Sequence, residues 1–205
     1  MTELFISAIV TFFVVIDPPG CAPIFASLTN GTPAAHRRAM ALRSTMVASL
    51  ILFAFALGGK AFLSALHVSL DAFRIAGGIM LFLIALDMVF EKRTERRENR
   101  AQDVLVAEHD DISIFPMGIP MIAGPGSIAS AMLLTSRADG WTERGVVLGA
   151  LAVTLLLTMV SLLLAGPLMK LVGNRVEAMI TRVLGVILAA LAAQFVIDGV
   201  KASFL

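Results

Sequence analysis

Cysteine, aromatic residues and charge are scarce in this chain. Its single cysteine, Cys21, excludes an intramolecular disulfide framework, and no paired-Cys or Cys/His spacing typical of a metal site occurs. It has no tyrosine and one tryptophan, and only 15% of its 205 residues are charged. No nucleic-acid footprint and no Gly-rich phosphate loop is present. The chain is 58% hydrophobic with a mean hydropathy of +0.90, values typical of a polytopic α-helical membrane protein.

The first apolar segment, Leu4 to Leu28, contains an acid and a proline-rich run. Asp17 is followed at 18–23 by Pro-Pro-Gly-Cys-Ala-Pro, which no uninterrupted helix accommodates. A break at membrane depth is tolerated only where protein or a water-filled cavity satisfies the freed backbone groups. The sequence therefore predicts a functional or closely packed feature in mid-membrane.

Apolar runs predict six membrane spans and hence an all-α polytopic fold. The stretch 91–111 between the third and fourth spans is the only strongly charged one, and its mixed signs predict a solvated helical linker without a binding role. A second set of Pro and Gly residues, at 116–126, interrupts the fourth span. The predicted spans are 4–28, 44–66, 72–90, 112–136, 145–165 and 181–200.

Lysine and arginine are unevenly divided between the two sides of these spans. The positive-inside rule puts the richer side in the cytoplasm and both termini outside. Outside lie Lys60, Arg74, Arg137, Arg144 and Lys201. The cytoplasmic set is Arg37, Arg38, Arg43, Lys92, Arg93, Arg96, Arg97, Arg100, Lys170, Arg175 and Arg182.

An internal repeat organises the chain. A shift of 106 positions places Pro19 on Pro125 and Gly20 on Gly126. Because each half has three spans, the second must be inserted upside down, which is typical of secondary transporters with a site at the repeat interface. The predicted units are a first three-span repeat at 1–90 with its broken helix at 17–23, a cytoplasmic linker at 91–111, and an inverted repeat at 112–205 with its broken helix at 116–126.

Three signatures in this order resemble the MarC family, also described as small neutral amino acid transporters of the SnatA type. The resemblance covers essentially the whole chain and implies a six-span protein of the bacterial or archaeal cytoplasmic (inner) membrane. The signatures are Asp17–Gly20 with Pro23–Phe25, Phe73–Ile79 with Ala85–Asp87, and Phe115–Pro120 with Ala123–Ile128.

The chemistry at the two breaks suits a zwitterion. A helix restarting after each Pro-Gly pair exposes unpaired N–H groups that stabilise a carboxylate. The carbonyls at the preceding helix ends, with an ionised Asp17, favour an ammonium group or a coupling cation. Small neighbours, and the lack of Tyr or Trp near either break, favour small side chains. The predicted substrate-binding residues are Asp17, Pro18, Pro19, Gly20, Cys21, Ala123, Gly124, Pro125, Gly126 and Ser127.

Plainer interpretations accompany these roles. The alternative for Asp17 is the N-cap of the restarting helix, a role compatible with a substrate or proton role, and the alternative for Cys21 is a small apolar residue that fills space. The candidates for ion coupling or for supporting the site also have a purely structural interpretation. Polar groups in membrane spans pair helices or extend to the membrane interface. These candidates are Asp87, Gln194, Arg74 and Arg182.

The predicted function is a secondary transporter of small neutral amino acids, glycine- or alanine-like, with alternating access around the two breaks. Protons, sodium or the substrate's own gradient remain open as energy source, as does the direction of transport, and no cofactor or metal is expected. A passive small-solute channel and a non-transporting membrane subunit are the alternatives. An enzyme is not expected, because the constellations of membrane hydrolases are missing. The expected partners are the substrate, the lipid bilayer and, optionally, further copies in a homo-oligomer.

Overall fold

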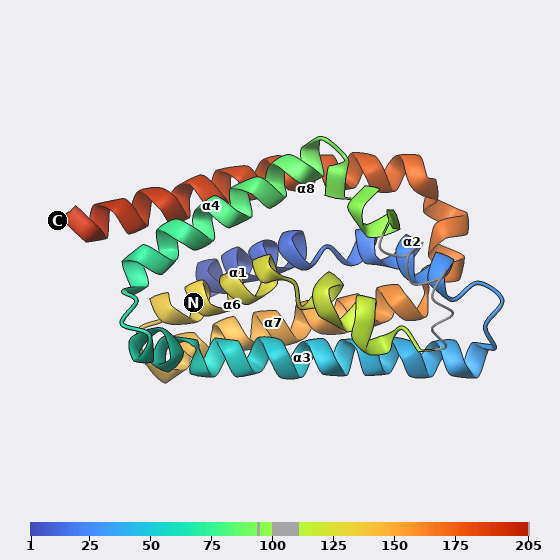
Figure 1. Ribbon diagram of the computed structural model, residues 1–205, viewed down its shortest axis with the longest axis horizontal. Coiled ribbons are helices and arrows are strands. Elements are labelled where there is room, and N and C mark those ends of the chain that lie inside the picture. Colours follow the sequence, from blue (N-terminus) through green and yellow to red (C-terminus); the bar gives the residue numbers. More distant parts are fainter. Residues whose placement is uncertain (94, 100–110, 205) are drawn as a thin grey trace.

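The computed structural model describes residues 1–93, 95–99 and 111–204, and of 169–175 and 177 only the backbone. The side chains of Lys170 and Arg175, and most of the predicted linker, therefore lie outside the described part. The rest is built of helices, as predicted (Figure 1). They are α1 (Thr2–Ile16), α2 (Pro18–Leu28), α3 (Ala34–Ala65), α4 (Leu70–Val89), η1 (Ser113–Ile122), α6 (Pro125–Arg137), α7 (Gly140–Leu163) and α8 (Ala165–Phe204).

Within the described residues, five helical segments are long and apolar enough to cross a bilayer, counting α1 and α2 together as one. The pair η1 and α6, bent by 53° at its break, supplies a sixth. The chain is therefore a multi-pass helical membrane protein, in agreement with the predicted six spans.

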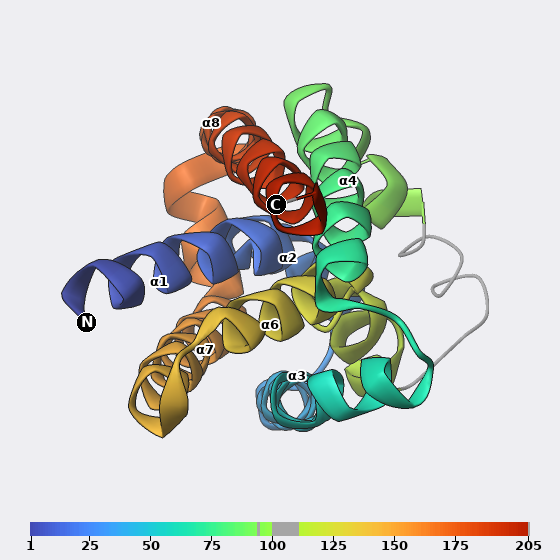
Figure 2. The same ribbon diagram turned by 90° about the vertical axis from the view of Figure 1, so that its left-hand side faces the viewer.

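The helices form three layers, and each layer takes one span from each half of the chain (Figures 1 and 2). α4 packs along α8 on one side, α3 packs with α7 on the other, and the broken spans α1–α2 and η1–α6 lie between them. Both termini lie at one end of the bundle, here called the termini end, and the opposite end is called the linker end. The inverted relation of the two halves stays a prediction.

Two helices extend beyond the predicted spans. α3 begins at Ala34, so Arg37, Arg38 and Arg43 lie inside a helix rather than in a flanking loop. α8 begins at Ala165, so it includes residues 166–180, which lie between the predicted fifth and sixth spans and include Gly166 and Pro167. The prediction was wrong there because proline is tolerated in the first turn of a helix, where its missing N–H would have no acceptor.

Glycine brings α4 and α8 together. A Cβ atom at Gly78 would lie 2.7 Å from Val196 Cγ2 and 2.9 Å from the Ala192 carbonyl oxygen. The backbone of α8 therefore occupies the place of a side chain, as is typical of membrane helix pairs joined by van der Waals packing.

We expect Gly78→Ala to lower the thermal unfolding midpoint in detergent, because the added methyl group forces α4 away from α8 at a cost of about 1–3 kcal/mol. Gly58→Ala is the matched control, since a Cβ there meets nothing within 4 Å and alanine favours a helix. Equal midpoints for the two variants would contradict close packing at Gly78.

Candidate functional site

The first break is a single residue. Asp17 adopts a left-handed conformation (φ 60°, ψ 65°), which ends α1 and starts α2 at Pro18. Its Oδ1 accepts a hydrogen bond from the Gly20 N–H at 3.1 Å. The predicted capping role is therefore confirmed, and the break is narrower than 17–23, because Pro18 and Pro19 occupy the first turn of α2, where proline needs no acceptor.

The other carboxylate oxygen of Asp17 forms an ion pair with an arginine of the linker. Arg97 donates to Asp17 Oδ2 at 2.8 Å, and the two residues are 6% and 1% exposed. Arg97 also reaches the Ile16 carbonyl at 3.5 Å, and Arg93 donates to the Val15 carbonyl at 2.6 Å. Two arginines thus satisfy both the buried acid and the carbonyls that the last turn of α1 leaves without partners.

The prediction of a solvated linker was wrong for Arg97, which is 6% exposed, whereas most of the other described linker residues are exposed. An acid buried in a membrane protein requires a counter-charge, and here Arg97 provides it. Two sequence signals pointed to the linker: the acid lacks a cation within its own span, and Arg93 and Arg97 are four positions apart and so share one helix face.

Gly20 makes room for this ion pair. A Cβ atom at that position would lie 2.2 Å from Asp17 Oδ2 and 2.8 Å from Arg97 Nη1. A side chain there would therefore displace the paired groups themselves. The Pro-Pro-Gly sequence provides a helix start that tolerates two prolines and leaves space for a guanidinium group.

The second break lies between η1 and α6. Backbone at Phe115 and Ile119 is extended within η1, and Gly124 leads into α6 with φ −82° and ψ 170°. The Ile128 N–H donates to the Gly124 carbonyl at 3.0 Å, and no side chain caps the helix. The first-turn N–H groups of α6 therefore have neither an intrahelical acceptor nor a cap.

A cavity of about 300 Å³ connects the two breaks. The first turn of α6 forms one wall, α4 forms another, and the linker arginines close it on the side of the first break. Its lining residues are Val15, Met80, Leu83, Ile84, Asp87, Arg93, Arg96, Arg97, Pro120, Met121, Gly124, Pro125, Gly126 and Ser127.

The charge around this cavity is positive. Three of its lining residues are arginines and one is an acid, Asp87, which pairs with Arg96. With Asp17 neutralising Arg97, the described residues around the cavity have one cationic charge more than acidic charges. Burial and the neighbouring charge of Arg97 lower the pKa of Arg93 to about 10, which keeps it protonated at neutral pH. Together with the helix dipole of α6, the cavity is suited to a single carboxylate.

The predicted substrate-binding residues separate into two groups. Gly124, Pro125, Gly126 and Ser127 line the cavity. Those of the first break do not, and neither does Ala123. Among them Cys21 is fully buried, with its Sγ 3.5 Å from the Ile16 carbonyl oxygen, so it fills space inside the bundle.

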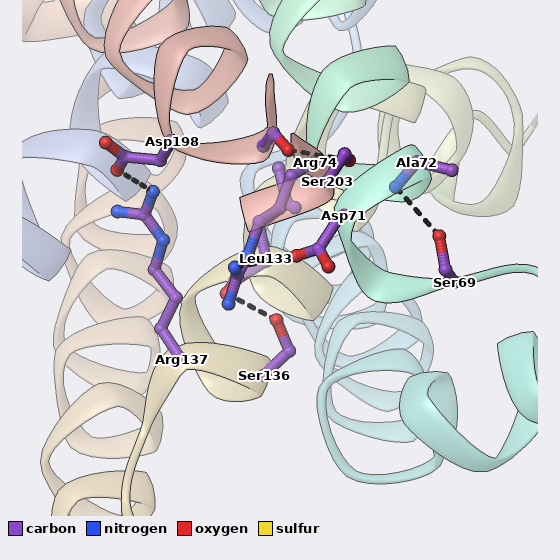
Figure 3. Close-up of polar contacts among 10 residues, drawn as sticks. Ser69, Asp71, Ala72, Arg74, Leu133, Ser136, Arg137, Asp198 and Ser203 are labelled. Atoms are coloured by element: carbon purple, nitrogen blue, oxygen red, sulfur yellow. Dashed lines mark hydrogen bonds and ion pairs between the residues drawn. The ribbon is translucent and has the colours of Figure 1, made fainter. Parts of the chain in front are cut away.

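The four residues proposed for coupling or support lie in different places. Asp87 lines the cavity, but Arg182 pairs with Glu91 at the surface. Arg74 pairs with Asp71 at the termini end, far from the breaks (Figure 3). Gln194, also at the termini end, donates to Asp198 at 2.6 Å. Arg74 and Gln194 thus bond within their own helices, Arg182 links α8 to Glu91 just after α4, and none of the three lines the cavity.

An ion pair that the sequence analysis missed ties α6 to α8 at the termini end. Arg137 pairs with Asp198 (Figure 3), and its guanidinium carbon lies 4.7 Å from the centre of the Phe195 ring. The two residues lie 61 positions apart on different helices, α6 and α8, where no spacing rule could match them. The contact holds the bundle closed at the end opposite the arginine-lined cavity.

No three His, Cys, Asp or Glu side chains of the described residues gather as metal ligands. The cavity offers arginine and backbone N–H donors, which suit an anion rather than a metal ion. Fold and site together define a polytopic helical membrane protein with two broken spans and a positively charged cavity beside them.

Comparison with known sequences places the chain in a family: residues 2–204 match the MarC family of integral membrane proteins, and the chain belongs to it. A UPF0056 membrane protein of Methanocaldococcus jannaschii is 36% identical over 99% of this chain and 98% of its own length. UPF0056 membrane protein YvbG of Bacillus subtilis is 32% identical over 100% and 97%, and YhcE of Escherichia coli is 30% identical over 94% and 89%. No solved structure matches significantly.

We expect Asp17→Asn to destabilise the protein by about 3–5 kcal/mol, because it removes the carboxylate from a buried ion pair with Arg97. Asparagine also adopts the left-handed conformation and caps helices. The change therefore removes the ion pair but keeps the helix break and the N-cap. Thermal unfolding in detergent provides the measurement, and Asp17→Asn with Arg97→Gln should cost less than the sum of the single changes.

Glu91→Gln is the control for that experiment. It removes the acid of an exposed ion pair with Arg182 and should cost less than about 1 kcal/mol. If Asp17→Asn were as mild as Glu91→Gln, the buried pair would not hold the linker in the break.

Proposed function

We propose that this chain is a secondary transporter of small neutral amino acids, and that the cavity between the two breaks is its substrate site. One observation carries the proposal: the uncapped first turn of α6 and Arg93 line the same cavity, which has one cationic charge in excess among its described residues. A neutral amino acid brings one carboxylate and one ammonium group, and the carboxylate matches that excess.

The carboxylate would accept hydrogen bonds from the N–H groups of Gly126 and Ser127 and pair with Arg93. The ammonium group would lie toward Asp87, the acid in the cavity wall, which it would share with Arg96. The volume of about 300 Å³ is at the lower end of the range of about 300–1,000 Å³ for ligand sites. This favours glycine- or alanine-like substrates over bulky ones.

Asp17 has an indirect role in this proposal. Its carboxylate holds Arg97, and so keeps the 91–99 segment against the first break. In alternating access, the cavity must open to each side in turn. We place the linker arginines at the gate toward the linker end and the pair Arg137 and Asp198 at the gate toward the termini end.

The proposed location is the cytoplasmic (inner) membrane of a bacterium or archaeon, with both termini outside. The linker end would then face the cytoplasm. A proton or sodium gradient, or the gradient of the substrate itself, would drive transport.

Transport by purified protein in proteoliposomes tests the proposal. We expect saturable uptake of labelled glycine and alanine, and exchange of external label for unlabelled substrate trapped inside. Imposed pH and sodium gradients identify the coupling ion. Flux that does not saturate and shows no exchange would favour a passive channel, and no flux above empty liposomes would favour a non-transporting subunit.

Arg93→Gln should weaken apparent substrate affinity by roughly tenfold or more, because a charge-assisted contact to the carboxylate is lost. Lys92→Gln is the matched control, since Lys92 is exposed and does not line the cavity. Uptake rates measured over a range of substrate concentrations give the apparent substrate affinity of each variant, and gel filtration tests whether each variant is folded. Equal affinities for the two variants would remove Arg93 from the site.

A further inference from the structure

A second, larger cavity opens at the termini end, remote from the two breaks. It has a volume of about 660 Å³ and lies between α3 and α7, with α6 as its floor. Met132 and Thr135 of α6 are buried beneath it, whereas Leu57 of α3 is 58% exposed at its edge. The cavity is therefore a groove in the outer surface of the bundle, where a spanning helix meets lipid.

Two cations from different helices line this groove, Lys60 of α3 and Arg144 of α7. Among the described residues neither forms an ion pair, and no acid lines the groove. Glu143, next to Arg144 in the sequence, accepts a hydrogen bond from the Asp139 N–H at 2.8 Å and so caps its own helix. The groove therefore holds two positive charges without a protein anion.

The guanidinium group of Arg144 is partly buried and packs against a tryptophan. Its Nε is buried and has no hydrogen-bond partner, and its guanidinium carbon lies 5.4 Å from the centre of the Trp141 ring. Stacking on the tryptophan holds the group in place, but a buried donor without an acceptor is costly. A snorkelling arginine would expose this donor to water, whereas here it is buried at the groove and is available to an anion.

The depth of the groove identifies the anion. α3 has 32 residues, so it is about 48 Å long and its ends reach the headgroup layers on both sides of a hydrocarbon core of about 30 Å. Lys60 lies about 7.5 Å before the end of α3, and Arg144 about 6 Å after the start of α7. Trp141, 78% exposed, stands where interfacial tryptophans are found. The two cations are therefore at the level of lipid phosphates.

We propose that this groove binds the phosphate of an anionic phospholipid, held by Lys60 and Arg144, with an acyl chain along Leu57 and Leu148. Arg144 Nε donates to the phosphate, and Trp141 covers the headgroup. The lipid belongs to the leaflet at the termini end and ties α3 to α7. This site is separate from the substrate cavity, so the test of lipid binding does not depend on whether the protein is a transporter.

Lipid binding to the purified full-length protein tests this site. Phosphatidylglycerol is titrated into protein in a neutral detergent, bound lipid is counted by native mass spectrometry, and the thermal unfolding midpoint is followed in parallel. We expect saturable binding and a higher midpoint. Lys60→Gln with Arg144→Gln should weaken apparent affinity by roughly tenfold or more, because two charge-assisted contacts are lost.

Two controls test whether lipid binding depends on the groove itself. Lys201→Gln removes an exposed cation at the same end of the bundle, outside the groove, and should bind lipid as the parent does. Inorganic phosphate at the lipid concentration should leave the midpoint unchanged, because it lacks the acyl chain. Lys60→Gln alone, a change at an exposed position, should weaken binding too, which keeps the test decisive if the double variant misfolds.

Three results would overturn the proposal. Unchanged lipid binding by both the double variant and Lys60→Gln would exclude the two cations. An equal loss in Lys201→Gln would show attraction to surface charge in general. Saturation by inorganic phosphate with the same midpoint shift would identify a site for a soluble anion instead of a lipid.

Discussion

A buried carboxylate in an apolar bundle is the constraint on which this structure depends. Asp17 has no water to solvate it, so it needs a cation and hydrogen-bond donors in fixed positions. The Gly20 N–H and Arg97 provide them, at 3.1 Å and 2.8 Å. Glycine is required at position 20 because a side chain there would displace the ion pair. One acid thus determines where α1 ends, how α2 begins and where the linker lies.

The linker connects three spans through this arrangement. Its segment 91–99 pairs with Asp17 after α1, with Asp87 of α4 and with Arg182 of α8. A charged stretch between two halves of a membrane protein is ordinarily a solvated tether. Here its arginines form a wall of the central cavity, and its ion pairs reach both halves of the chain, through Arg97 to Asp17 and through Glu91 to Arg182.

The two breaks differ in how their backbone groups are satisfied, and this difference locates the proposed substrate site. At the first break the protein's own arginines satisfy the carbonyls of α1, and an acid caps α2. At the second, α6 begins without a side-chain cap beside a cavity. Donors that the fold leaves without protein acceptors are the ones available to a ligand. The groove at the termini end follows the same rule with Lys60 and Arg144.

The sequence by itself determined the class, the spans and the two breaks, because hydropathy and proline act locally: an apolar run of sufficient length crosses a bilayer, and Pro-Gly pairs interrupt a helix wherever they fold. It also indicated Asp17 and the residues 124–127 as candidate site residues. Only the tertiary structure decided which of these face a cavity and which cation meets Asp17. The partner Arg97 lies 80 positions away, and Arg137 and Asp198 lie 61 apart. Pairing over such distances depends on how helices pack, which no local pattern encodes.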